Sequence, residues 1–235
     1  MMAMASPGRL LRPALLATAL LGLAAAAANA KGTGYIFVSN EKGDAVTVLD
    51  GANYKLIKNI KTGKRPRGMR FNADHTQIYV ACGDSDRIDI IDVARLADVG
   101  KIPNVPDPEA FDIDQAGKFL YVSNEDSHEL SIIDLAAKKQ VKAVKVGLEP
   151  EGVLLTPDGR VVYVANEASN FVSAIDVASG TVKATIPTDQ RPRRFALTPD
   201  GKQLWVSAEI AGMLDVIDTA SNKVVGKVTF DPRGF

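Results

Sequence analysis

The sequence predicts an all-β fold made of repeated four-stranded units, and three observations carry this prediction. Aromatic residues, aspartates and prolines each recur at one constant step along the chain, without an insertion. Each interval holds four short runs of β-forming residues separated by turn residues. After residue 30 there is no amphipathic helical pattern longer than about two turns. Four strands in a repeat of about 42 residues, the step observed here, is typical of a β-propeller blade. The aromatic positions are Phe37, Tyr79, Tyr121, Tyr163 and Trp205; the aspartates are Asp50, Asp92, Asp134, Asp176 and Asp218; the prolines are Pro66, Pro108, Pro150 and Pro192.

The repeat around Tyr163 illustrates the four predicted strands. A first apolar run ends at a Pro-Asp-Gly turn, and the second run carries the tyrosine. A polar turn leads to a third run, which alternates in polarity and ends at an aspartate, and a Ser-Gly turn leads to a more polar fourth run. The four runs are 152–156, 161–165, 171–176 and 181–186.

The N-terminal segment 1–30 has the pattern of a cleavable export signal. Arg9 and Arg12 precede an apolar stretch at 13–27, and Ala-Asn-Ala at 28–30 gives the small-x-small pattern that a signal peptidase recognises. The apolar stretch of about 15 residues is shorter than the ~20 needed to span a bilayer as a helix. We therefore expect a cleaved signal at 1–30 and a periplasmic propeller domain at 31–235.

Composition narrows the possible functions. The chain has 28 basic and 28 acidic residues, so its net charge alone points to no nucleic-acid partner. Without the two arginines of the signal, 26 basic and 28 acidic residues remain, a formal charge of −2. The single cysteine, Cys82, excludes an internal disulfide, and with only two histidines the chain offers few metal ligands. We expect Cys82 to be a small core residue at the end of a strand.

Five tetrapeptides at the aromatic positions resemble the sequence that names the YVTN β-propeller repeat family. Two copies of Leu-Thr-Pro-Asp-Gly, at 155–159 and 197–201, add to the resemblance, which covers the whole chain after the signal. Within this group the chain is most similar to the β-propeller proteins associated with pyrroloquinoline-quinone (PQQ)-dependent catabolism. The tetrapeptides are Phe37-Val-Ser-Asn40, Tyr79-Val-Ala-Cys82, Tyr121-Val-Ser-Asn124, Tyr163-Val-Ala-Asn166 and Trp205-Val-Ser-Ala208.

The resemblance also implies a ring larger than this chain supplies. Propellers of the family usually have about seven blades, whereas residues 35–235 hold fewer than five full repeats. The chain starts in the second strand of a blade and stops at 231–235, where a new inner strand should begin. We expect about five blades of an incomplete seven-bladed ring; the alternative is a five-bladed ring that closes poorly. The repeat units are 35–77, 78–119, 120–161, 162–203 and a partial unit, 204–235.

Features shared by every repeat are best explained by the fold. The five aspartates end the third strand, where a carboxylate can accept hydrogen bonds from backbone N–H groups of the next turn. The five aromatic residues are expected to fill the space between blades. Both sets are therefore interpreted as structural rather than as ligands.

The candidate functional residues are the charged residues around the shared prolines, because these differ between repeats. In the family's architecture the loop from a fourth strand to the next first strand lies at one mouth of the central channel. The charges in successive loops run positive, negative, negative, positive. This predicts a bipolar mouth that docks a polar ligand or a protein partner, with arginines suited to anionic groups. The alternative is solvated charges with salt bridges worth about 0–1 kcal/mol each. The residues are Arg65, Arg67, Asp107, Glu109, Glu149, Glu151, Arg191, Arg193 and Arg194.

Catalytic motifs for hydrolysis, haem attachment, zinc binding or phosphate binding are absent from the sequence. We therefore expect no catalytic residue, no metal and no cofactor, and an exported, non-enzymatic binding or scaffold protein with no membrane span after cleavage. The resemblance implies a periplasmic protein partner in a quinoprotein alcohol-oxidation pathway. The alternative is a propeller-based enzyme or electron-transfer subunit, such as a quinoprotein dehydrogenase subunit or a lactonase-like hydrolase.

Overall fold

A computed structural model describes residues 32–230, which form a set of β-propeller blades. Its 19 strands form one three-stranded sheet and four four-stranded sheets, all antiparallel. The expected signal at 1–30 lies outside the described residues, as do residues 231–235. In the part of the chain that the structure covers, no helix is long and apolar enough to cross a membrane.

Each sheet uses strands that are consecutive in the chain. The first sheet holds β1 (Tyr35–Asn40), β2 (Ala45–Asp50) and β3 (Leu56–Lys61). The second holds β4 (Pro66–Phe71), β5 (Gln77–Cys82), β6 (Arg87–Asp92) and β7 (Ala97–Pro103), and the third β8 (Pro108–Ile113), β9 (Phe119–Asn124), β10 (Glu129–Asp134) and β11 (Lys139–Lys145). The fourth holds β12 (Pro150–Leu155), β13 (Val161–Asn166), β14 (Phe171–Asp176) and β15 (Thr181–Pro187), and the fifth β16 (Pro192–Leu197), β17 (Gln203–Ala208), β18 (Met213–Asp218) and β19 (Lys223–Thr229).

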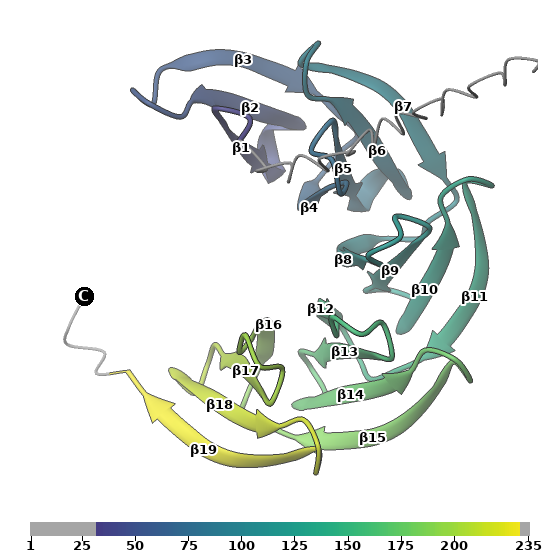
Figure 1. Ribbon diagram of the computed structural model, residues 1–235, viewed down its shortest axis with the longest axis vertical. Coiled ribbons are helices and arrows are strands. Elements are labelled where there is room, and N and C mark those ends of the chain that lie inside the picture. The colour runs from purple at the N-terminus through teal and green to yellow at the C-terminus, as the bar shows by residue number, and fades with distance from the viewer. Residues whose placement is uncertain (1–31, 231–235) are drawn as a thin grey trace, which may run out of the picture. The chain divides into compact units, whose positions relative to one another are not determined.

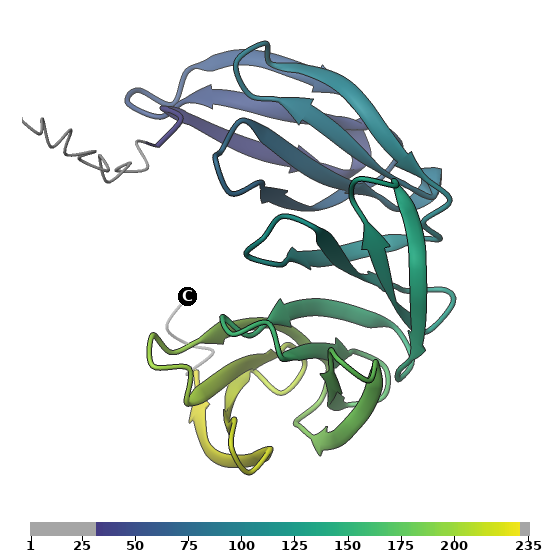
Figure 2. The ribbon, with the colours of Figure 1, turned by 45° about the vertical axis from the view of Figure 1, so that its right-hand side comes forward.

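The sheets follow one another around an arc, with β4, β8, β12 and β16 at its inner side (Figure 1). The turned view shows the same sheets as separate, twisted blades (Figure 2). Contacts between β4 and β8, between β8 and β12, and between β12 and β16 join the inner strands of neighbouring sheets. The predicted all-β fold of four-stranded propeller blades is confirmed.

Three of the repeated aromatic residues, Tyr79, Tyr121 and Tyr163, are buried between neighbouring sheets. Tyr79 of β5 is buried against Leu120 of the next sheet, and Tyr163 of β13 is buried against Leu204. Tyr121 lies in the same way against residues of the fourth sheet. These three tyrosines are covered by the following blade, whereas Trp205 of the fifth sheet is only half-buried. For the middle blades the repeat step therefore sets how neighbouring sheets stack.

The repeated aspartates close the turn after the third strand of each blade. Asp92 Oδ1 accepts the N–H of Arg95 at 2.7 Å, and Asp134 Oδ1 accepts the N–H of Ala137 at 2.8 Å. Asp50, Asp176 and Asp218 accept equivalent bonds. Each aspartate thus accepts a backbone N–H three residues further along the chain and caps its turn.

Cys82 is the last residue of β5 and is fully buried, as predicted. Burial, with the nearby Asp89 carboxylate, raises the pKa of the thiol to about 12. Only the thiolate is a nucleophile, so at about pH 8 the native chain should react with a disulfide reagent roughly a thousandfold more slowly than the urea-unfolded chain. A reagent that releases a coloured thiol on reaction allows the labelling rates of the native and the unfolded chain to be followed by absorbance. Rapid, complete labelling of the native chain would contradict a buried Cys82.

Candidate functional site

The predicted charged residues lie at one edge of the blades, in loops and in the first residues of the inner strands. We call two sets of segments the mouth loops: the connections from fourth to first strands with the first residues of those first strands (62–67, 104–109, 146–151 and 188–194), and the turns from second to third strands with the last residue of each second strand (40–44, 82–86, 124–128, 166–170 and 208–212). In the three-stranded sheet, β1, β2 and β3 correspond to the second, third and fourth strands of the other sheets. Both types lie at the same edge because neighbouring strands of each sheet are antiparallel.

The backbone holds the residue before each shared proline in the left-handed region. Its φ is 54° at Arg65, 34° at Asp107, 49° at Glu149 and 68° at Arg191. The carbonyl of Arg65 accepts a hydrogen bond from the N–H of Gly83 at 3.1 Å, and the other three carbonyls accept equivalent bonds from the turn after the second strand of the sheet that each loop leads into. A non-glycine residue keeps such a conformation only when its surroundings enforce it. The mouth loops are therefore rigidly placed.

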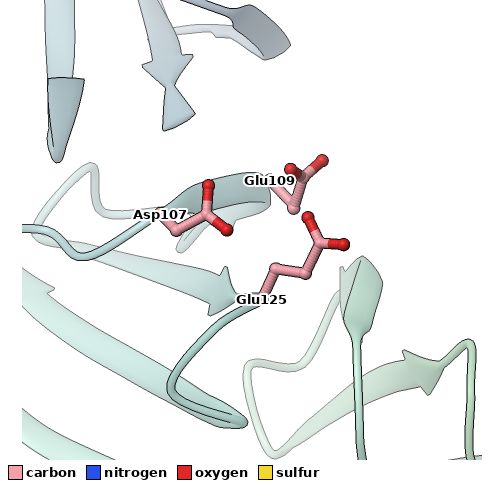
Figure 3. Close-up of side chains that lie close together, drawn as sticks. All are labelled: Asp107, Glu109 and Glu125. Atoms are coloured by element: carbon pink, nitrogen blue, oxygen red, sulfur yellow. The ribbon is translucent and has the colours of Figure 1, made fainter. Parts of the chain in front are cut away.

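Three carboxylates gather around the guanidinium of Arg65. Figure 3 shows Asp107, Glu109 and Glu125 facing one another. Arg65 Nη2 lies 2.5 Å from Asp107 Oδ1 and 3.3 Å from Glu125 Oε2, and it also contacts Glu109 Oε1. Its Nε lies 3.1 Å from Asp84. Three carboxylates at this spacing could hold a cation, and here the arginine supplies the positive charge.

Glu151 connects arginines from two inner strands. Its Oε1 accepts hydrogen bonds from Nη2 of Arg67 at 3.0 Å and from Nη2 of Arg193 at 2.9 Å. Its Oε2 lies 3.2 Å from Nη1 of Arg194. Arg67 stands on β4 and Glu151 on β12, two sheets further along the chain. The Glu151 side chain is only 4% exposed, so this ion-pair centre is buried.

Arg67 also binds the carboxylate of Glu109, which lies on β8 in the sheet between those of β4 and β12. Arg67 Nε lies 2.7 Å from Glu109 Oε2, and the Glu109 side chain is 0% exposed. Arg67 therefore joins the inner strands β4, β8 and β12 through two buried carboxylates. The alternative of solvated charges with weak surface pairs does not describe Glu109 or Glu151.

A further set of acids lies in the turns from second to third strands and was not among the predicted site residues. Glu41, Glu125, Glu167 and Glu209 follow the same repeat step, with Gly83 at the remaining position. Glu209 lies 3.2 Å from Arg191 and 3.1 Å from Arg193, and Arg193 lies 3.0 Å from Glu167. The repeat step itself was the signal that could have found them.

We call the connected ion pairs the mouth network. It joins five arginines to eight acids, a formal charge of −3 if all are ionised. Of the nine predicted site residues, eight belong to it; Glu149 is exposed and makes no ion pair with another described residue. The members are Arg65, Arg67, Arg191, Arg193, Arg194, Glu41, Asp84, Asp107, Glu109, Glu125, Glu151, Glu167 and Glu209.

Burial and charge act against each other in the network. Burial raises the pKa of the Glu109 carboxyl, as does its neighbour Glu125, while Arg67 and Arg65 oppose this rise. Burial also raises the pKa of Glu167, against Arg191 and Arg193. For Arg65, burial favours a lower pKa, but Glu109 and Asp107 outweigh it and hold the pKa above its usual value. The arginines therefore stay charged, and the carboxylates depend on them.

The added acids change the charge pattern of the mouth. The mouth loops together carry 13 acidic residues and seven basic residues, a difference of −6. The charges next to the prolines do change sign between loops, but glutamates of the neighbouring turns offset the arginines of the fifth sheet. The mouth is therefore net acidic rather than divided into a positive and a negative half.

The blades and the mouth network define a β-propeller protein with an acidic, tightly paired mouth. The chain belongs to the YNCE-like beta-propeller family, which it matches over residues 28–158 and 154–234. No curated protein sequence matches the chain significantly.

Solved structures share the propeller fold. Hydrazine synthase of Kuenenia stuttgartiensis superposes with a TM-score of 0.66 and 28% identity, over 70% of this chain and 49% of that chain. The chain thus spans about half the length of that protein. A functionally unknown protein from Desulfotomaculum acetoxidans DSM 771 superposes with a TM-score of 0.70 and 15% identity, over 85% of this chain and 69% of its own.

Proposed function

We propose that this chain is an exported, non-enzymatic binding module whose mouth loops dock a protein partner with a basic surface. The observation that carries the proposal is the net charge of −6 on rigid loops at one edge of the blades. The Arg-flanked apolar start and the Ala-Asn-Ala at 28–30 support export to the periplasm. The resemblance to PQQ-associated propellers supports a partner from a quinoprotein alcohol-oxidation pathway.

The mouth network supports binding because it presents its charges in fixed positions. Burying Glu109 and Glu151 costs desolvation energy, and their ion pairs with arginines only offset this cost. A charged surface that is already ordered loses little side-chain entropy when a partner docks. The exposed acids around it would steer a basic partner and set its orientation.

A purified PQQ-dependent alcohol dehydrogenase from the same host is the partner to test by surface plasmon resonance. The double variant Asp84→Asn with Asp126→Asn removes two exposed mouth charges without touching Glu109 or Glu151. We expect the double variant to bind about tenfold more weakly and with a smaller salt dependence of the affinity. Exposed charges at the edge of an interface act mainly through long-range attraction, which salt screens.

Asp158→Asn is the matched control, since Asp158 is an exposed acid in a turn at the opposite edge of the fourth sheet. It should leave binding unchanged. Unmeasurable binding of the dehydrogenase to the wild-type chain would reject the pathway. Equal affinity of the double variant and the control would reject the mouth as the docking surface.

A second candidate is an enzyme or electron-transfer subunit. The likeness to hydrazine synthase, at 28% identity, favours it because part of an enzyme shares this fold. An absorption spectrum of the protein purified from its host distinguishes the two. A bound chromophore, with activity that depends on it, would favour the subunit; a spectrum of protein alone favours the binding module.

A further inference from the structure

The inner strands line a cavity, partly open to solvent, that the proposed docking of a protein partner does not use. It has a volume of about 280 Å³ and is lined by residues of β4, β8, β12 and β16, the strands at the inner side of the arc (Figure 1). Three arginines, Arg67, Arg70 and Arg194, line it. Among the described residues, no acidic side chain does. The wall is therefore cationic although the mouth loops nearby are net acidic.

Two of these arginines have guanidinium groups that are only partly paired. Arg70 is 49% exposed; its Nε lies 3.6 Å from Asp112 and 3.5 Å from the carbonyl of Phe111, both at or beyond the limit of a hydrogen bond. Arg194 is 51% exposed and has one carboxylate partner, Glu151, at 3.2 Å. Since a guanidinium carries five N–H donors, both groups keep donors for a ligand.

The carboxylates that pair with Arg67 do not line the cavity. Glu109 and Glu151 are buried within the mouth network and hold the Arg67 guanidinium through Nε and Nη2. They lower the positive charge felt in the cavity but fix one of its walls in place. A pre-ordered arginine loses less entropy on binding than a free one.

The rest of the wall is largely apolar. Met69, Phe111, Val153 and Phe195 line the cavity beside the arginines. An inorganic anion would leave these side chains without a partner, whereas an organic body would cover them. The planar guanidinium fork matches a carboxylate in two-point contact.

We propose that this cavity binds a small organic anion that carries carboxylate groups on an apolar body. Arg70 and Arg194 bind the carboxylates, Arg67 adds charge, and the apolar side chains cover the body. The inference goes beyond the proposed docking of a protein partner, which uses exposed acids of the mouth loops, and either one can fail without the other.

Isothermal titration calorimetry of the purified chain tests the proposed anion site with four probes: phthalate, succinate, inorganic phosphate and the uncharged phthalamide. We expect phthalate to bind most tightly, because it combines two carboxylates with an apolar ring, and succinate more weakly. Phthalamide should not bind measurably. Phosphate binding as tight as that of phthalate would overturn the assignment to an organic anion, and the absence of binding by both dicarboxylates would overturn the site.

Arg70→Ala and Arg194→Ala should each weaken phthalate binding at least tenfold, since each removes a charge-assisted contact. Arg160→Ala is the matched control, because Arg160 is a highly exposed arginine outside the cavity whose only ion pair among the described residues is at 3.8 Å. Circular dichroism melts show whether each variant folds. If Arg194→Ala unfolds because its contact with Glu151 is lost, the phthalate affinity of Arg70→Ala alone tests the proposal. Unchanged affinity in folded Arg70→Ala would reject the proposal.

Discussion

Replacing Glu151 by Gln should lower the free energy of unfolding by about 3 kcal/mol. Gln keeps the shape of the side chain but removes the charge that Arg67, Arg193 and Arg194 share. Removing one partner of a buried ion pair leaves the other charges uncompensated, which costs more than the pair contributed. Urea unfolding followed by circular dichroism gives the change in midpoint at a constant slope.

Glu149→Gln is the matched control, two positions away, exposed and free of ion pairs with the other described residues. It should change stability by no more than about 0.5 kcal/mol. High salt adds a second comparison, because ions screen exposed pairs far more than buried ones. If the Glu151 effect disappears at about 1 M NaCl, where the Debye length is ~3 Å, the network is an ordinary set of surface salt bridges.

The fold could be predicted from the sequence because its signals are local and repeated. The aromatic residues and aspartates recur at one constant step, and each has a role within its own blade or against the next one. Such short-range roles reappear in every repeat, so the step alone identifies them. The bounds of the strands follow, since the turns between them carry their own residue signatures.

The chemistry of the mouth was only partly predictable, because burial there depends on contacts across several blades. Arg67 and Glu151 are 84 residues apart and meet through the convergence of inner strands. Nothing local at Glu109 or Glu151 distinguishes a buried carboxylate from a solvated one. The glutamates at 41, 125, 167 and 209 were predictable in principle, since they follow the repeat step, although their pairing with arginines was not.

Because the inner strands β12 and β16 lie close together at Gly152, we expect Gly152→Ala to lower the free energy of unfolding by about 3 kcal/mol. A Cβ atom at Gly152 of β12 would lie 2.1 Å from the carbonyl oxygen of Arg193 on β16. The clash is with backbone, and the Arg193 side chain is itself held by Glu151, so β16 cannot move away freely. Ala110 occupies the equivalent position of β8, so the strand pair β8 and β12 accommodates a Cβ atom that Gly152 of β12 cannot carry.

Gly100→Ala is the control for Gly152→Ala. Its Cβ would meet only side-chain atoms at 3.7 and 3.8 Å, which is ordinary contact, and alanine suits a strand better than glycine. Thermal and urea unfolding of both variants should therefore show a loss for Gly152→Ala and no loss for Gly100→Ala. Equal stability of the two variants would mean that β12 and β16 can separate at little cost. The ion pairs of Glu151 would then be a flexible contact between blades, and the charged mouth would lack the rigidity on which the proposed docking surface depends.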